Sequence, residues 1–182
     1  MRASRAYKDR PIIFICHSLG GLVVKSALRH ANERRTLYGN IANSTKAILF
    51  FGTPHQGSDI AAYLTGFQKA ILLDKTEFVG DIARWSAPLE ELTATFSEIA
   101  PNYDITTFFE QRAIEGVIVV PEGSARMGQA NERIRGLNEN HVSLCRFSGA
   151  DSNWRIVSGR LQAIADSINK DRSEGRSDYM PV

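Results

Sequence analysis

A serine on a glycine-rich turn is the residue best suited to chemistry in this sequence. Ser18 lies in the run Cys16-His17-Ser18-Leu19-Gly20-Gly21, directly after the apolar segment 11–16 and directly before a helical pattern. A strand, a sharp turn and a helix in this order form a nucleophile elbow, which holds a serine in a strained backbone conformation and lifts its hydroxyl out of the sheet. The pattern predicts a nucleophilic serine.

Two neighbours of Ser18 fit this interpretation. An elbow needs small residues two positions before and after the serine so that strand and helix can approach; Gly20 meets this need, while Cys16 replaces the usual first glycine. The backbone N–H of Leu19, at the positive end of the helix, is the expected donor to an oxyanion. The alternative is a plain strand-turn-helix in which Ser18 caps the helix.

The elements that position the serine follow from apolar patterning. We expect strands at 11–16, 46–51, 105–109 and 116–120, with Asn43 and Ser44 opening the second, and helices at 19–33, 58–72, 89–99 and 154–168. Residues 131–141 are polar and are expected to form a loop. Alternating strands and helices predict an α/β fold with a mostly parallel sheet of about four strands, flanked by helices.

The chain of 182 residues suits one domain. Residues 11–170 are expected to form it, preceded at 1–10 by the exposed end of a helix. Residues 72–88 are expected to form a lid and 171–182 a flexible polar tail.

Charge and cysteine content exclude several functions. The net charge is +2, with 22 basic and 20 acidic residues, and no basic block that could follow a nucleic acid backbone. No apolar run approaches the roughly 18 residues of a membrane span. Cys16 and Cys145 lack partners at metal-ligand spacing, so we expect free buried thiols.

Four motifs in one order give the chain a family resemblance. FICHSLGGLVVKSAL, ILFFGTPHQGSD, VPEGSA and NENHVSLCRF resemble the serine-active-site lipase-like α/β hydrolases, a group that contains SERAC-type proteins, PGAP-like deacylases and fungal hydrolase modules. The resemblance spans about residues 11–168 and implies hydrolysis of an acyl ester or lipid, with a triad in the order serine, acid, histidine and with no metal or organic cofactor.

Carried over residue by residue, the resemblance assigns the nucleophile to Ser18, the acid to Glu110 at the end of TTFFE, and the base to His141 in the NENH loop. In this arrangement the imidazole takes the serine proton and the carboxylate fixes its tautomer. Alternatives for the acid stay open at Glu115, Glu122 and Asp104.

The remaining histidines are expected to be non-catalytic. His17 neighbours the nucleophile, so its side chain should diverge from the serine hydroxyl. His55 lies in a glycine-rich loop and is expected to have a hydrogen-bonding structural role. His30 lies in the middle of a helix and is not expected to belong to a functional site.

The resemblance covers only the C-terminal half of an α/β-hydrolase, because several strands and the second oxyanion donor lie before the elbow in the family. We therefore expect an exposed edge on the nucleophile strand that invites a partner strand, and weak or no esterase activity of the isolated chain. The competing hypothesis is a non-catalytic signalling or adaptor module, or a truncated gene product.

The substrate and its surroundings are less specified. One group of residues could line an acyl pocket or pack as an amphipathic helix: Tyr63, Phe67, Leu72, Phe78 and Trp85. The resemblance implies an intracellular protein of the cytoplasm, mitochondrion or endoplasmic reticulum, with peripheral membrane contact.

Overall fold

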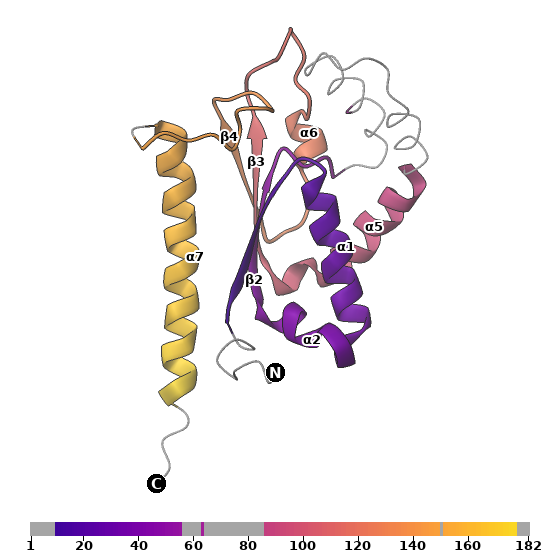
Figure 1. Cartoon of the computed structure of the whole chain (residues 1–182), viewed down its shortest axis with the longest axis vertical. Helices are drawn as coiled ribbons and strands as arrows, with labels where there is room; N and C mark the ends of the chain where they lie inside the picture. Colours follow the sequence, from indigo (N-terminus) through magenta and orange to yellow (C-terminus); the bar gives the residue numbers. More distant parts are fainter. Residues whose placement is uncertain (1–9, 56–62, 64–85, 150, 178–182) are drawn as a thin grey trace, which may run out of the picture. The chain divides into compact units, whose positions relative to one another are not determined.

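A four-stranded parallel sheet is the centre of the fold. The computed structural model describes residues 10–55, 63, 86–149 and 151–177 in two compact units, Met1–Cys145 and Arg146–Val182. The first unit contains β1 (Ile12–His17), β2 (Thr45–Phe51), β3 (Asp104–Glu110) and β4 (Glu132–Leu137), in the order β1-β2-β3-β4. Each strand pairs in parallel with the next, so their carboxyl ends meet at one edge (Figure 1). The expected α/β architecture is confirmed.

Helices pack against one face of this sheet. The first unit has α1 (Gly20–Glu33), α2 (Arg35–Ser44), α5 (Ser86–Ile99), the short 3₁₀ helix η3 (Ala100–Asn102) and α6 (Glu122–Ala125). Figure 1 shows α1 and α5 on the same side of the strands. The core on this side joins strand residues to helix residues: Cys16, Leu28, Ile48, Phe50, Phe96, Ala100, Tyr103 and Ile105. Burial of this apolar face fixes α1, and with it the turn that precedes it.

The fourth strand does not lie where the apolar pattern predicted it. Residues 116–120 contribute only an isolated antiparallel bridge between Ile114 and Val117, and Val119 and Val120 are buried in a small apolar cluster. The strand is β4, inside the segment expected to be a loop. The side chains of β4 alternate between half-buried and exposed positions. Its two arginines occupy exposed positions, so they are compatible with a strand at the edge of the described sheet.

Two helices also differ from expectation. Asn43 and Ser44 end α2 and do not open β2, and α2 itself was not predicted. α5 begins at Ser86, so residues 86–88 of the expected lid are helical. Several expected elements lie outside the described residues: residues 1–9, the rest of the lid, and the helix at 58–72 apart from Tyr63.

The second unit consists mainly of one long helix, α7 (Ser152–Ser177). The helix continues past Asp171, where a flexible tail was expected. Exposed pairs four residues apart support its polar end: the Gln162 side-chain amide donates to Asp166, and Lys170 lies 3.8 Å from Glu174.

Two properties of the described residues bear on function. Cys16 is a buried thiol as expected, but Cys145 is exposed, so that part of the prediction is wrong. Among the described helices, none combines the length and apolar character needed to span a bilayer.

Candidate active site

Ser18 sits on a strained turn between β1 and α1. Its φ is 56°, in the left-handed region that costs a residue with a Cβ about 1–2 kcal/mol. Two hydrogen bonds hold the turn in place: the Ser18 N–H donates to the Phe51 carbonyl at 2.8 Å, and the Thr53 hydroxyl donates to the Ser18 carbonyl at 3.0 Å. The end of β2 therefore maintains the conformation of the turn.

The structure does not support the alternative role of Ser18 as a cap of the following helix. The N-cap of α1 is Leu19, and no side-chain cap hydrogen bond is made there. Ser18 is not a helix cap.

The close approach of helix and strand occurs at a different glycine from the one expected. A Cβ on Gly21 would lie 2.3 Å from the Thr53 Oγ1 and 2.9 Å from the Phe50 ring, whereas a Cβ on Gly20 would meet nothing within 4 Å. Gly21, and not Gly20, lets α1 pack against the sheet.

The start of α1 presents backbone donors beside the serine. The first turn's hydrogen bonds begin with the Gly21 N–H, which donates to the Ser18 carbonyl at 3.1 Å. The N–H of Leu19 precedes this ladder and lies at the positive end of the helix. Such an N–H can stabilise negative charge that develops next to the serine.

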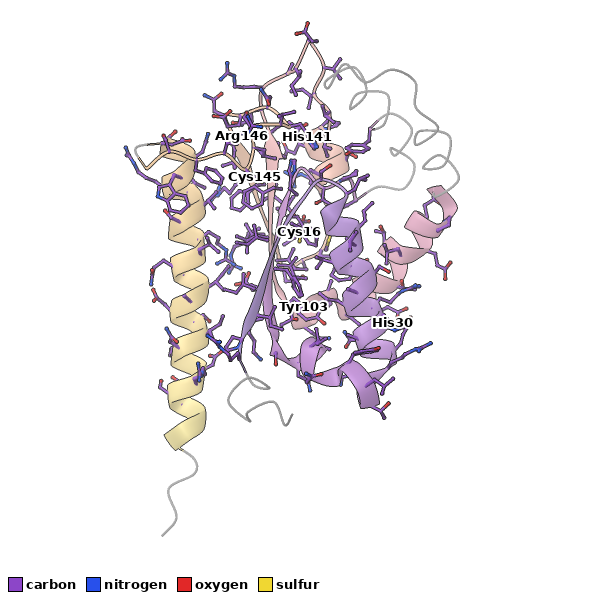
Figure 2. The ribbon with its side chains drawn as sticks, in the orientation of Figure 1. Cys16, His30, Tyr103, His141, Cys145 and Arg146 are labelled. Carbon is purple, nitrogen blue, oxygen red and sulfur yellow. The ribbon has the colours of Figure 1, made fainter. Side chains whose placement is uncertain are left out.

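A buried carboxylate and imidazole meet at the carboxyl edge of the sheet. The His141 Nδ1–H donates to the Glu110 Oε2 at 3.2 Å, and the side chains are 1% and 0% exposed. The Val120 N–H donates to the other carboxylate oxygen at 2.6 Å, which orients Glu110. Figure 2 shows His141 at this end of the strands, far from Tyr103. With Nδ1 bound to the carboxylate, a neutral imidazole carries its lone pair on Nε2.

The rival acids lie elsewhere. Glu115 is exposed, and Glu122 is exposed and paired with Arg126. Asp104 is the first residue of β3, at the opposite end of the strand from Glu110, and pairs with Arg133 at 3.0 Å. Of the four candidate acids, Glu110 is the one hydrogen-bonded to His141.

His17 supports the imidazole from the other side. Its Nε2–H donates to the His141 backbone carbonyl at 2.9 Å, and the two ring centroids are 4.9 Å apart. Burial lowers the pKa of His17, and a charge on His141 would lower it further. A neutral His17 therefore tethers the His141 backbone to the end of β1, a role that sequence reasoning missed.

Gly52 allows the carboxylate and imidazole to meet above β2. Its φ is +55°, and a Cβ there would lie 3.0 Å from the His141 Nδ1 and 3.1 Å from the Glu110 Oε2. A side chain at this position would crowd both groups.

The Ser18 hydroxyl contacts a tyrosine that the sequence suggested only as pocket lining. Its Oγ lies 2.6 Å from the Tyr63 Oη, and the Tyr63 ring lies edge-on to the His141 ring, 6.0 Å between centroids. Among the described residues, the Ser18 hydroxyl is thus hydrogen-bonded to Tyr63 and not to His141. Phe67, Leu72, Phe78 and Trp85 lie outside those residues.

His55 and His30 stay away from the serine. His55 is 1% exposed, and its backbone bonds the Thr93 hydroxyl at 3.0 Å, while its ring packs edge-on against Phe50. Its ring nitrogens have no hydrogen-bond partner among the described residues, so the expected hydrogen-bonding role belongs to its backbone alone. Burial lowers the pKa of His55 well below 6.5. The His30 ring lies 5.5 Å from Tyr38 on the outer side of α1.

The chain is similar to part of a known protein. It is 32% identical to SERAC1 of Bos taurus and of Mus musculus and 31% identical to SERAC1 of Homo sapiens, in each case over 170 residues and 90% of this chain. The chain spans about a quarter of the length of these relatives. No family model and no solved structure matches it.

Proposed function

We propose that this chain, which is 31–32% identical to part of the SERAC1 proteins, is a lipase-like α/β hydrolase that uses a serine to cleave an acyl ester. Ser18 is the nucleophile, His141 the general base and Glu110 the acid that orients it. The observation that carries the proposal is the buried hydrogen bond between His141 and Glu110, together with a serine held at positive φ.

The reaction has two halves. His141 Nε2 takes the Ser18 proton as Oγ attacks the ester carbonyl, and the Leu19 N–H stabilises the oxyanion. The imidazolium then returns its proton to the leaving alcohol, and a water repeats the cycle to release the acid. Glu110 stabilises the imidazolium.

The neighbours of the serine favour an acyl group over a charged one. Leu19 packs against the apolar cluster of Tyr63, Val119, Val120 and Ala125. The cluster itself is buried, but Leu19, Phe109 and Ile114 at its margin are only partly buried. An acyl chain in contact with this margin would bury apolar surface, at about 25 cal/mol per Å². We propose carboxylic esters, including those of lipids, as the substrate class.

Fluorophosphonate labelling tests the assignment, because the probe phosphonylates an activated serine even where turnover is slow. We expect an adduct on Ser18 that disappears in Ser18→Ala and His141→Ala and persists in Ser173→Ala, which removes an exposed hydroxyl on α7. Glu110→Gln should slow labelling strongly, whereas Glu122→Gln should not, because Glu122 pairs with Arg126.

A non-catalytic adaptor module is the second candidate. Two observations favour it: β1 is an edge strand, which pairs only with β2 within the described sheet, and the Ile15 side chain on it is 59% exposed. Absence of labelling in a sample with a cooperative unfolding transition would support the adaptor and reject the hydrolase.

A further inference from the structure

Tyr63 directs a buried hydroxyl at the nucleophile. The residue is 2% exposed, and its ring packs with Val119, Val120 and Ala125. Its Oη lies 2.6 Å from the Ser18 Oγ. An aromatic ring fixed by apolar neighbours has little freedom, so the hydroxyl stays next to the reacting atom.

We propose that Tyr63 is a further catalytic residue whose hydroxyl donates a hydrogen bond to the ester carbonyl oxygen and to the oxyanion formed from it. The inference rests on the proposed hydrolase function and names a second donor beside the Leu19 N–H. A side-chain hydroxyl aimed at the place where charge develops is one of the groups that stabilise such oxyanions.

The chemistry balances without a further reactant. The Oγ–carbon bond forms, the Ser18 proton passes to His141, and the carbonyl π pair becomes the oxyanion, which accepts hydrogen bonds from Leu19 and Tyr63. Collapse restores the carbonyl and breaks the bond to the leaving oxygen, which takes the proton from His141. Tyr63 keeps its own proton throughout.

Two physical features favour Tyr63 as a donor. Burial raises the pKa of its phenol, and this outweighs the lowering effect of the Ser18 hydrogen bond; the Glu110 charge adds a smaller rise, so the phenol stays protonated at neutral pH. When Oγ becomes an ester oxygen, it is a poorer acceptor for the Tyr63 hydroxyl. The neighbouring oxyanion is the stronger acceptor, so the hydrogen bond tightens as the transition state forms.

Tyr63→Phe tests the proposal, because phenylalanine fills the same apolar space and removes only the hydroxyl. With p-nitrophenyl butyrate we expect kcat to fall about a hundred- to a thousand-fold, with KM nearly unchanged. The affinity for an alkyl trifluoromethyl ketone, which forms a tetrahedral serine adduct, should fall by a similar factor, while that for the matching methyl ketone should change little.

Tyr103→Phe is the matched control. Tyr103 is also buried, at 3% exposure, and its hydroxyl accepts a hydrogen bond from the Asn32 Nδ2 at 2.9 Å, away from the serine. We expect it to lower stability and leave kcat unchanged.

The outcomes separate the two proposals. Hydrolysis that survives Ser18→Ala would reject the hydrolase itself. Hydrolysis that depends on Ser18 but is unchanged in Tyr63→Phe would reject the role of Tyr63 alone. Faster hydrolysis or labelling in Tyr63→Phe would also overturn it, because the hydroxyl would then be restraining the serine.

Discussion

Replacing Gly52 with alanine should damage the site without removing any proposed catalytic group. The new Cβ would lie 3.0 Å from the His141 Nδ1 and 3.1 Å from the Glu110 Oε2, closer than the 3.4–4 Å of ordinary van der Waals contact. The neighbours must move by a few tenths of an ångström. The His141–Glu110 hydrogen bond is already 3.2 Å long, so this movement brings it to the limit of a useful bond.

The magnitude follows from misplacement of the base. A shift of about 1 Å can cost a hundred-fold in rate, so we expect kcat/KM to fall roughly 10- to 100-fold. The positive φ of Gly52 adds a stability cost of about 1–2 kcal/mol for any residue with a Cβ. The assays are p-nitrophenyl butyrate kinetics and guanidinium unfolding.

Alanine substitutions at two other glycines serve as controls, because they distinguish the cost of a positive φ from the cost of a close contact with the new Cβ. Gly116 has a φ of +76° with open space around its Cβ position, so Gly116→Ala should cost stability but not activity. Gly123 has neither positive φ nor a close neighbour, so Gly123→Ala should cost little of either. If Gly52→Ala retains as much activity as Gly116→Ala, a Cβ at position 52 does not disturb His141 and Glu110 as we expect.

Three further predictions concern packing and titration. Gly21→Ala places a Cβ 2.3 Å from the Thr53 hydroxyl and should lower the unfolding free energy by about 1–3 kcal/mol, measured by guanidinium denaturation. Burial lowers the pKa of Lys25 from 10.5 to about 7, so between these pH values the unfolded chain binds more protons and the free energy of unfolding rises with pH. The free energy of unfolding of the wild type relative to Lys25→Met should therefore increase from pH 7 to 10. A difference that stays constant over this range would refute the prediction. Burial raises the pKa of Cys16 to about 12, so iodoacetamide at pH 8 should leave this thiol unmodified until the protein unfolds, as peptide mass mapping would report.

The sequence predicted the strand-turn-helix units where local pattern and tertiary burial agree. β2 is apolar almost throughout and is buried at residues 47–51, so its pattern suffices. β4 reads ERIRGL and is recognised as a strand only through its register with β3, which is a long-range property. The apolar run at 116–120 misled because Val119 and Val120 bury their side chains in a local cluster outside the sheet.

The candidate site was predictable to a different extent. Motif order pointed to Ser18, Glu110 and His141, and the last two are hydrogen-bonded across 31 positions of sequence. Sequence periodicity does not predict the hydrogen bond from His17 to the His141 backbone or the contact of Tyr63 with the serine. Both depend on how loops meet at the carboxyl ends of the strands. The motif likewise pointed to Gly20 as the glycine that must stay small. In the structure, a Cβ would meet close neighbours at Gly21 and Gly52 and none at Gly20.

The most direct test of the proposed hydrolase is the mass of the protein after brief incubation with p-nitrophenyl acetate and an acid quench. A covalent serine mechanism predicts one added acetyl group, located on the Ser18 peptide and absent from His141→Ala. An acetyl group that persists without His141, or that maps to another residue while Ser18 stays unmodified, would contradict activation of this serine.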